Sequence, residues 1–247
     1  MTKPVEEAQR RALVTGGSGG IGAAICRRLA ADGLHVIVHA NTGLDRAELL
    51  VTDIRQHGGC AQAVAFDVTD RAAANTAIER LLQTGPIQVL VNNAGIHDDA
   101  VFPGMRGEQW DRVVDVSLNG FFNVTQPLTL PMIRTRWGRI ISISSVAAVA
   151  GNRGQVNYSA AKGALHAASK SLALELASRG VTVNAVAPGL IDTGMIEGQF
   201  DAEAVKRLVP MQRVGQPREV ADLVGFLVSN QAAYISGQVI SINGGMI

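Results

Sequence analysis

The sequence predicts an α/β fold in which one doubly wound, seven-stranded parallel sheet carries helices on both faces. Short apolar segments alternate with longer segments of helical periodicity, which is typical of a parallel sheet covered on both sides. The chain has 247 residues, 47% of them apolar, and this length suits one domain with a substantial core.

The elements are expected in strict alternation along the chain. The strands are predicted at 12–15, 36–39, 61–66, 89–92, 139–143, 182–187 and 239–242. The helices are predicted at 20–32, 45–57, 70–82, 109–134, 158–179 and 217–229. We expect one domain over residues 11–247, preceded by a flexible tail of residues 1–10. The segment at about 190–210 lacks strong periodicity, so we interpret it as a mobile lid over the substrate.

The first strand runs directly into a glycine-rich turn. Residues 15–22 read Thr-Gly-Gly-Ser-Gly-Gly-Ile-Gly, and the first helix opens within them. Strand, turn and helix bring backbone N–H groups and the positive end of a helix to one point, where a pyrophosphate can sit. A side chain on these glycines would block the close approach of backbone to phosphate. The sequence therefore predicts a Rossmann-type dinucleotide site here, in preference to a plain turn.

Three side chains in the second half of the chain suit proton transfer. Tyr158 and Lys162 are four residues apart in a predicted helix, so they share one face about one turn apart. A nearby ammonium group is expected to lower the pKa of the tyrosine and make it a workable acid or base. Ser145 ends the apolar segment 139–145 and could offer its hydroxyl to the same substrate oxygen. Tyr-x-x-x-Lys is also common on solvated helix faces, so this interpretation depends on the dinucleotide site.

With the glycine-rich turn and the three proton-transfer side chains in one sequence, the chain resembles the short-chain dehydrogenase/reductase family. The match covers about residues 11–247 and is most similar to the 3-oxoacyl-[acyl-carrier-protein] reductases in segments 154–162, 177–184, 232–237 and 242–246. The motifs that carry it, in chain order, are Thr-Gly-x-x-x-Gly-x-Gly at 15–22, Asp67-Val68, Asn92-Asn93-Ala94-Gly95, Ser145, Tyr158, Lys162 and Pro188-Gly189 with Thr193.

The resemblance implies a dinucleotide site and a reductase reaction. Tyr158 would donate a proton to the substrate oxygen, Ser145 would polarise it, and Lys162 would also reach the nicotinamide ribose. Asp67 would hold the adenine amino group and Thr193 the carboxamide, although a helix-entry residue and a turn residue are the plain alternatives. The residues implied in cofactor binding are Thr15, Gly16, Ser18, Gly20, Ile21, Gly22, His39, Asn41, Asp67, Val68, Asn93, Ala94, Gly95, Tyr158, Lys162, Pro188, Gly189, Ile191 and Thr193.

The end of the second strand bears on the choice of cofactor. Family members that use NAD usually carry a carboxylate there, and this chain has Ala40. NADPH is therefore the expected cofactor, with NADH possible. The arginine that many NADPH-dependent relatives carry in the glycine turn is absent, because Gly19 occupies its place. The remaining partners for a 2′-phosphate are His39, Asn41, Thr42 and Arg46.

One position departs from the family pattern. The catalytic asparagine of relatives aligns with Ser117 here. In relatives the main-chain carbonyl of this residue holds a water that links the lysine to solvent. A serine keeps the carbonyl, and its hydroxyl can bond to nearby helix carbonyls, so activity could survive. The substitution also leaves open a catalytically weak subunit that works beside an active paralogue.

Partners follow from the resemblance and from the surface of the last long helix. The matching reductases contact an acidic acyl carrier protein through residues that correspond to Arg136 and Arg179, although arginine also suits a solvated helix end. Small residues on the outward face of helix 158–179 suit packing against a second copy, and a homotetramer or dimer is expected.

Composition excludes several classes of function. The net charge is +1, which gives no general attraction to nucleic acid or anionic membranes. The first ten residues lack the apolar stretch of a secretory signal, and no segment approaches the length of a spanning helix, so a cytoplasmic location is expected. The sequence shows no metal-ligand spacing of Cys or His.

Three functions remain after this reading. The first is NADPH-dependent reduction of a 3-oxoacyl thioester in fatty-acid or polyketide-like synthesis. The second is a dehydrogenase of another small alcohol or ketone, such as a sugar or steroid. The third is a catalytically weak cofactor-binding partner, which Ser117 motivates.

Overall fold

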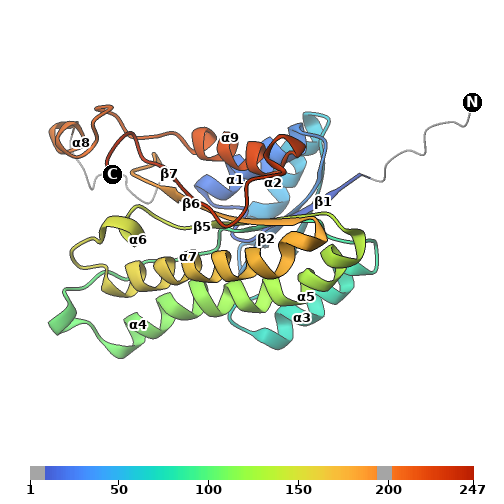
Figure 1. Cartoon of the computed structure of the whole chain (residues 1–247), viewed down its shortest axis with the longest axis horizontal. Helices are drawn as coiled ribbons and strands as arrows, with labels where there is room; N and C mark the ends of the chain where they lie inside the picture. Colours follow the sequence, from blue (N-terminus) through green and yellow to red (C-terminus); the bar gives the residue numbers. More distant parts are fainter. Residues whose placement is uncertain (1–8, 194–201) are drawn as a thin grey trace, which may run out of the picture.

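A seven-stranded parallel sheet forms the centre of the computed structural model, which describes residues 9–193 and 202–247 (Figure 1). The strand order is β3-β2-β1-β4-β5-β6-β7, so the chain builds outward from β1 and then crosses to the other side at β4. The strands are β1 (Arg11–Val14), β2 (His35–Ala40), β3 (Cys60–Ala65), β4 (Val89–Asn92), β5 (Gly138–Ile143), β6 (Val181–Pro188) and β7 (Val239–Ile242). The predicted fold class and all seven predicted strands are confirmed.

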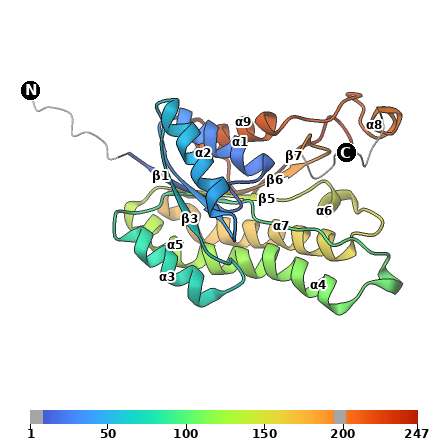
Figure 2. The same cartoon turned by 180° about the vertical axis from the view of Figure 1, so that it is seen from behind.

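Helices cover both faces of the sheet, as the view from behind also shows (Figure 2). One face carries α1 (Gly20–Ala31), α2 (Leu44–Gln56) and α9 (Pro217–Val228). The opposite face carries α3 (Arg71–Leu82), α4 (Gly107–Val114), α5 (Gly120–Thr135) and α7 (Val156–Leu176). The shorter elements are α6 (Ala147–Ala150), α8 (Ala202–Leu208) and the 3₁₀ turns η1 (Phe102–Gly104), η3 (Ala177–Arg179) and η4 (Asn230–Ala232).

The predicted helix 109–134 is interrupted. It consists of α4, a π-helical segment η2 (Asp115–Asn119) and α5. A π-helical turn inserts an extra residue into the hydrogen-bond ladder, which apolar periodicity does not reveal, and such turns are frequent at functional sites. Ser117 lies in the middle of this segment.

Two hydrophobic cores lie on the two faces of the sheet. Adjacent strand residues belong to different cores, because successive side chains of a strand point to opposite faces. On β1, Leu13 packs on the α3 and α5 side, whereas Val14 packs on the α1 and α9 side. All four residues of β1 are buried, as expected for a parallel strand with both faces covered. The sheet therefore provides a rigid frame whose carboxyl edge can hold a precise site.

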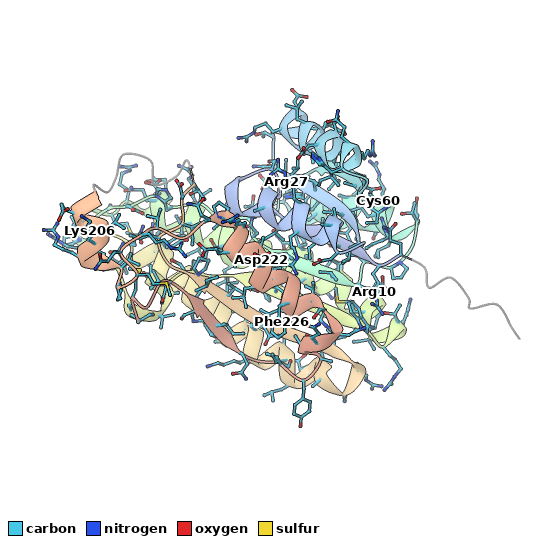
Figure 3. All side chains as sticks on the ribbon, turned by 90° about the horizontal axis from the view of Figure 1, so that it is seen from above. Arg10, Arg27, Cys60, Lys206, Asp222 and Phe226 are labelled. Carbon is cyan, nitrogen blue, oxygen red and sulfur yellow. The ribbon has the colours of Figure 1, made fainter. Side chains whose placement is uncertain are left out.

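Charged pairs join the helices α1, α2 and α9, which share one face of the sheet. Arg28 on α1 pairs with Asp32, directly after the same helix, and with Asp222 on α9. Arg27 pairs with Asp53 on α2 at 2.7 Å. Figure 3 shows Arg27 and Asp222 on neighbouring helices of this face. Exposed ion pairs of this kind contribute about 0–1 kcal/mol each to stability, so apolar packing against the sheet contributes most to holding these helices in place.

Two predictions fall partly on residues outside the described part of the chain. The predicted tail of residues 1–10 includes 1–8, and the predicted lid at about 190–210 includes 194–201. Within residues 9–193 and 202–247, no helix is long and apolar enough to cross a membrane. The same residues contain no cluster of three or more His, Cys, Asp or Glu side chains that could hold a metal ion.

Candidate active site

The predicted site residues gather at the carboxyl edge of the sheet, on the side where α6 and α8 lie in Figure 1. The glycine turn follows β1, Asn93 to Gly95 follow β4, and Ser145 follows β5. Tyr158 lies in the first turn of α7, which starts at the same edge. Ligands in open parallel sheets bind at this edge, next to the point where the strand order reverses. Here that point lies between β1 and β4.

The glycine turn is shaped by two close approaches of backbone. A Cβ on Gly22 would collide with the carbonyl oxygen of Gly16 and lie 2.8 Å from Asn93 Nδ2. That amide donates to the carbonyls of Thr15 (2.9 Å) and Gly16 (3.0 Å). The turn therefore packs tightly against the segment after β4 and opens directly into α1, as a pyrophosphate cradle requires. These residues fit a dinucleotide.

Thr15 ties the ends of β1 and β4 together. Its hydroxyl oxygen accepts hydrogen bonds from the backbone N–H groups of Asn93 and Ala94, both at 3.0 Å. The side chain is buried, so these bonds fix the floor of the predicted cofactor site. Thr15 thus positions the segment 93–95 and presents no free hydroxyl to a ligand.

The structure changes the role of His39. Its side chain is 2% exposed, and Nδ1 accepts a hydrogen bond from the Gly16 N–H at 3.1 Å. Nε2 lies 2.9 Å from the Phe66 carbonyl, to which it donates in this tautomer. Burial lowers the pKa of His39 to about 4, so the ring is neutral. Both ring nitrogens hold the loops together, and contact of His39 with a 2′-phosphate stays a prediction.

At the predicted adenine site, the side chain of Asp67 forms hydrogen bonds within its own turn. The Asp67 Oδ1 atom accepts from the backbone N–H and the hydroxyl of Thr69, both at 2.8 Å. Val68 is buried, and its carbonyl accepts from Asn123 Nδ2 at 2.9 Å. The turn is therefore fixed by its own hydrogen bonds. Contact of Asp67 and Val68 with an adenine ring stays a prediction.

Ser145, Tyr158 and Lys162 come together at the carboxyl edge. A hydrogen bond joins Ser145 to the Tyr158 side chain, and Ser145 Oγ also accepts from the Ala147 N–H at 3.2 Å. The Lys162 ammonium lies 5.9 Å from the centroid of the Tyr158 ring. One hydroxyl, one phenol and one ammonium thus share a single space, which is the arrangement that proton transfer to a carbonyl oxygen requires.

The pKa of Tyr158 differs from the expectation. Burial of the phenol raises this pKa, the hydrogen bond to Ser145 lowers it, and the Asp99 carboxylate raises it further. The predicted lowering by Lys162 is wrong here, since desolvation dominates and the ammonium donates to a backbone carbonyl. A raised pKa keeps the phenol protonated at neutral pH, which is the form that donates a proton.

Lys162 is held in a buried pocket. Its side chain is 3% exposed, and Nζ donates to the Ile143 carbonyl at 2.8 Å. A Cβ on Gly95 would lie 2.8 Å from Nζ, so only glycine leaves the ammonium its place. Burial lowers the pKa of Lys162 to about 8. An ammonium has three donors, and two remain for other partners.

Ser117 faces the same pocket from the π-helical segment. The residue is buried, and within the described part of the chain its hydroxyl has no hydrogen-bond partner. The Cβ position of Gly95 lies 3.8 Å from Ser117 Oγ and 2.8 Å from Lys162 Nζ, so hydroxyl and ammonium border one space. An orphaned buried hydroxyl next to an ammonium with free donors fits a bridging water.

The segment after β6 approaches the glycine turn. A Cβ on Gly20 would lie 2.9 Å from Thr193 Cγ2, so Thr193 covers the start of α1. Ile191 is buried and pairs with Gly215 in a β-bridge. The other predicted residues are Ser18 and Ile21, half-buried on the turn and α1; Asn41, exposed after β2; and Pro188 and Gly189, at the end of β6.

Arg136 and Arg179 lie at the opposite edge of the sheet. Arg136 precedes β5, and Arg179 precedes β6, so both are near the amino ends of the strands. Helix α7 starts near Tyr158 and ends near Arg179, which puts about 30 Å between them along the helix axis. The structure does not bring these arginines to the catalytic cleft of their own subunit.

Asn157 is a site residue to which the sequence assigned no role. Its side chain is fully buried, and Nδ2 donates to the carbonyls of Asp98 (2.9 Å) and Gln109 (3.0 Å). Its Oδ1 accepts from the Tyr158 N–H at 2.8 Å. Asn157 therefore fixes the first turn of α7, and with it Tyr158. An asparagine directly before Tyr158 was the available signal, since this side chain readily bonds backbone groups at helix starts.

Comparisons with known proteins give a consistent picture. Residues 10–204 match the family described as short chain dehydrogenase. The 3-oxoacyl-[acyl-carrier-protein] reductase FabG of Aggregatibacter actinomycetemcomitans is 44% identical over 95% of this chain and 98% of that protein. A 3-oxoacyl-[acyl-carrier-protein] reductase of Synechocystis sp. is 45% identical over 96% of both chains. Nodulation protein G of a Rhizobium species is 44% identical, again over 96% of both chains.

Proposed function

The chain belongs to the short-chain dehydrogenase family and is an oxidoreductase; on this premise we propose that it reduces a 3-oxoacyl thioester, bound to an acyl carrier protein, with NADPH. The observation that carries the proposal is the meeting of Ser145, Tyr158 and Lys162 beside the glycine turn. Similarity to the reductases of Aggregatibacter and Synechocystis over nearly the whole chain supports the same substrate class.

The reaction needs a hydride and a proton, and this chain supplies the proton. A nicotinamide dinucleotide supplies the hydride when it is bound. Tyr158 donates its phenolic proton to the 3-oxo oxygen as that oxygen gains charge, and burial keeps the phenol protonated until then. Ser145 donates a hydrogen bond to the same oxygen, which stabilises the growing charge. Lys162 provides positive charge beneath the phenol and has two donors left for ribose hydroxyls.

The preference for NADPH rests on the end of β2. Ala40 closes the strand without a carboxylate, and Arg46 lies over the following loop, where a Cβ on Gly43 would be 3.0 Å from its Nε. Because His39 is buried, the groups left for a 2′-phosphate are Asn41, Thr42 and Arg46, all exposed. An arginine in the first turn of α2 opposes the helix dipole, which suits a role in binding an anion.

Replacing Ala40 with aspartate is expected to reverse this preference. The new carboxylate would repel a 2′-phosphate but could accept a hydrogen bond from a 2′-hydroxyl. We expect kcat/KM for NADPH to fall about 100-fold, with a much smaller change for NADH. The matched control is Ala65→Asp, at the register partner of Ala40 on β3. A fall that is equal for both cofactors would contradict the assignment.

A substrate panel tests the proposed reaction. NADPH oxidation is followed with acetoacetyl and longer 3-oxoacyl groups on an acyl carrier protein, and with sugar and steroid ketones at equal concentration. We expect the 3-oxoacyl carriers to give the highest kcat/KM. A higher value for a sugar or steroid ketone would favour the alternative dehydrogenase. NADPH binding without turnover on any substrate would favour the catalytically weak partner that Ser117 motivates.

Assembly and carrier contact complete the proposal. We infer a homotetramer or dimer, supported by the exposed apolar side chains of Leu174 on α7 and of Phe122 and Leu130 on α5. If two α7 helices pack antiparallel, Arg179 of one subunit lies near the cleft of the other. An acidic carrier at Arg136 and Arg179 would then deliver its thioester across the interface. A cytoplasmic location is part of the same proposal.

A further inference from the structure

The hydroxyl of Ser144 bridges β5 to α7 immediately before Ser145. Ser144 is 4% exposed, and its Oγ lies 3.2 Å from the Lys162 carbonyl oxygen and 2.6 Å from His166 Nε2. A carbonyl oxygen can only accept, so Ser144 donates its single proton to Lys162. The Ser144 oxygen then accepts from His166, which must carry its proton on Nε2.

Side-chain hydrogen bonds run in both directions between the end of β5 and the Lys162 turn of α7. Lys162 Nζ donates to the Ile143 carbonyl at 2.8 Å, and the Ser144 hydroxyl donates back to the Lys162 carbonyl. The Ser144 N–H also donates to the Val186 carbonyl at 2.7 Å, which fixes the end of β5 against β6. The position of Ser145 relative to the Lys162 turn therefore depends on Ser144.

His166 completes the bridge from the next turn of the helix. It follows Lys162 by four residues, so the two side chains lie on one face of α7. Burial lowers the pKa of His166, and the charge of Lys170 lowers it further, so the ring is neutral near pH 7. A neutral imidazole has one N–H, and its short contact with Ser144 selects the tautomer that donates.

We propose that His166 is a positioning residue: through Ser144 it holds Ser145 and the Lys162 turn in register with Tyr158. The expected effect of His166 on kcat rests on the proposed reductase function. The expected effect on the arrangement of Ser145 and Tyr158 involves only side chains of this chain, so it can be tested without turnover. A histidine that merely filled space in the core would stabilise the fold but would not affect the alignment of Ser145 with Tyr158.

Steady-state kinetics test the role through matched variants. We expect His166→Leu to lower kcat about tenfold, because small misplacements of reacting groups are costly, while the KM for NADPH stays unchanged. His166→Gln should restore kcat to within about threefold, since the glutamine amide can donate from nearly the position of Nε2. The control is His57→Leu, an exposed histidine directly after α2, which should match wild type. Wild-type kcat in His166→Leu would overturn the proposal.

Double-variant kinetics separate a shared role from two unrelated defects. Ser144→Ala is expected to lower kcat by the same factor as His166→Leu. The kcat of the double variant should be no lower than that of the less active single variant. If the two losses multiply, the residues act independently, and the proposed route through Ser144 is wrong.

A spectroscopic readout does not require activity. The chain has two tyrosines, and Tyr234 is fully exposed, so Tyr234→Phe leaves Tyr158 as the single reporter. With tyrosine labelled with carbon-13 at Cζ, we expect His166→Leu to shift the Tyr158 resonance and His166→Gln to leave it in place. An unshifted resonance in His166→Leu would overturn the inference. Failure of wild type to reduce any 3-oxoacyl thioester would instead refute the proposed function, and this measurement would still decide the role of His166.

Discussion

Replacing Tyr158 with phenylalanine is expected to lower kcat for reduction of a 3-oxoacyl thioester by at least about 100-fold. The substitution removes one oxygen atom and keeps the ring, so packing around the first turn of α7 should persist. What disappears is the only phenol at the carboxyl edge of the sheet, because the other tyrosine, Tyr234, lies far along the chain on an exposed turn. General acid catalysis typically contributes about 10²–10⁴ in rate, which sets the expected loss.

Binding measurements distinguish this loss from damage to the cofactor site. The dissociation constant for NADPH should change by no more than about fivefold in Tyr158→Phe, since a hydrogen bond to a ribose hydroxyl contributes only about 1 kcal/mol. Tyr234→Phe is the matched control and should retain wild-type kcat. If Tyr158→Phe kept its turnover, another group would have to supply the proton.

Replacing Lys162 with methionine is expected to change activity and stability in opposite directions. Lysine and methionine have similar length, but methionine carries no charge and no donor. We expect kcat to fall by about 100-fold or more, because the developing charge near Tyr158 loses its positive neighbour. The same substitution should stabilise the fold near pH 7, since a buried ammonium is costly to desolvate.

The size and pH dependence of this stabilisation follow from the pKa of Lys162. Burial lowers it from 10.5 to about 8, which corresponds to a cost of about 3 kcal/mol at pH values below 8. Loss of the hydrogen bond to the Ile143 carbonyl destabilises the variant by about 1 kcal/mol. The free energy of unfolding of Lys162→Met should therefore exceed that of wild type by about 2 kcal/mol.

Between about pH 8 and 10.5 the unfolded chain binds more protons at Lys162 than the folded chain does. Wild-type stability therefore rises with pH relative to Lys162→Met, and the gap should narrow across this window. Denaturant unfolding at several pH values measures it. A variant less stable than wild type at pH 7 would show that the favourable interactions of the buried ammonium exceed its desolvation cost.

The fold was predictable because parallel strands with both faces covered leave an unambiguous pattern. The continuous apolar runs that contain Leu13, Val14, Ile140 and Ile141 are short and alternate with longer helical segments, which is typical of buried parallel strands. The π-helical segment around Ser117 was not predictable, since one extra residue in a helix turn hardly alters apolar spacing.

The candidate site was predictable in its residues but not in its electrostatics. The order of Ser145, Tyr158 and Lys162 along the chain indicated that they would meet, because each follows or starts an element at one edge of the sheet. Whether Lys162 lowers the pKa of Tyr158 depends on burial and on the direction of one ammonium group. Likewise, the loop-binding role of His39 depends on contacts with Gly16 and Phe66 from other elements.

Position along the chain also did not reveal how far the predicted carrier residues lie from the catalytic residues of their own subunit. Arg136 and Arg179 flank the strands that lead toward Ser145 and Pro188, but they do so at the amino ends of those strands. A helix of the length of α7 separates them from Tyr158 by about 30 Å. Only the direction of the strands, which the sheet topology supplies, shows that one subunit cannot combine these arginines with its own cleft.

Isotope transfer tests the central claim most directly. The wild-type chain is incubated with NADPH deuterated at the transferable position of the nicotinamide and with a 3-oxoacyl thioester, and the product is analysed by mass spectrometry. The proposal predicts a 3-hydroxyacyl product with one deuterium on carbon 3, formed by wild type and nearly absent with Tyr158→Phe. A product without deuterium, or equal product from both proteins, would contradict it.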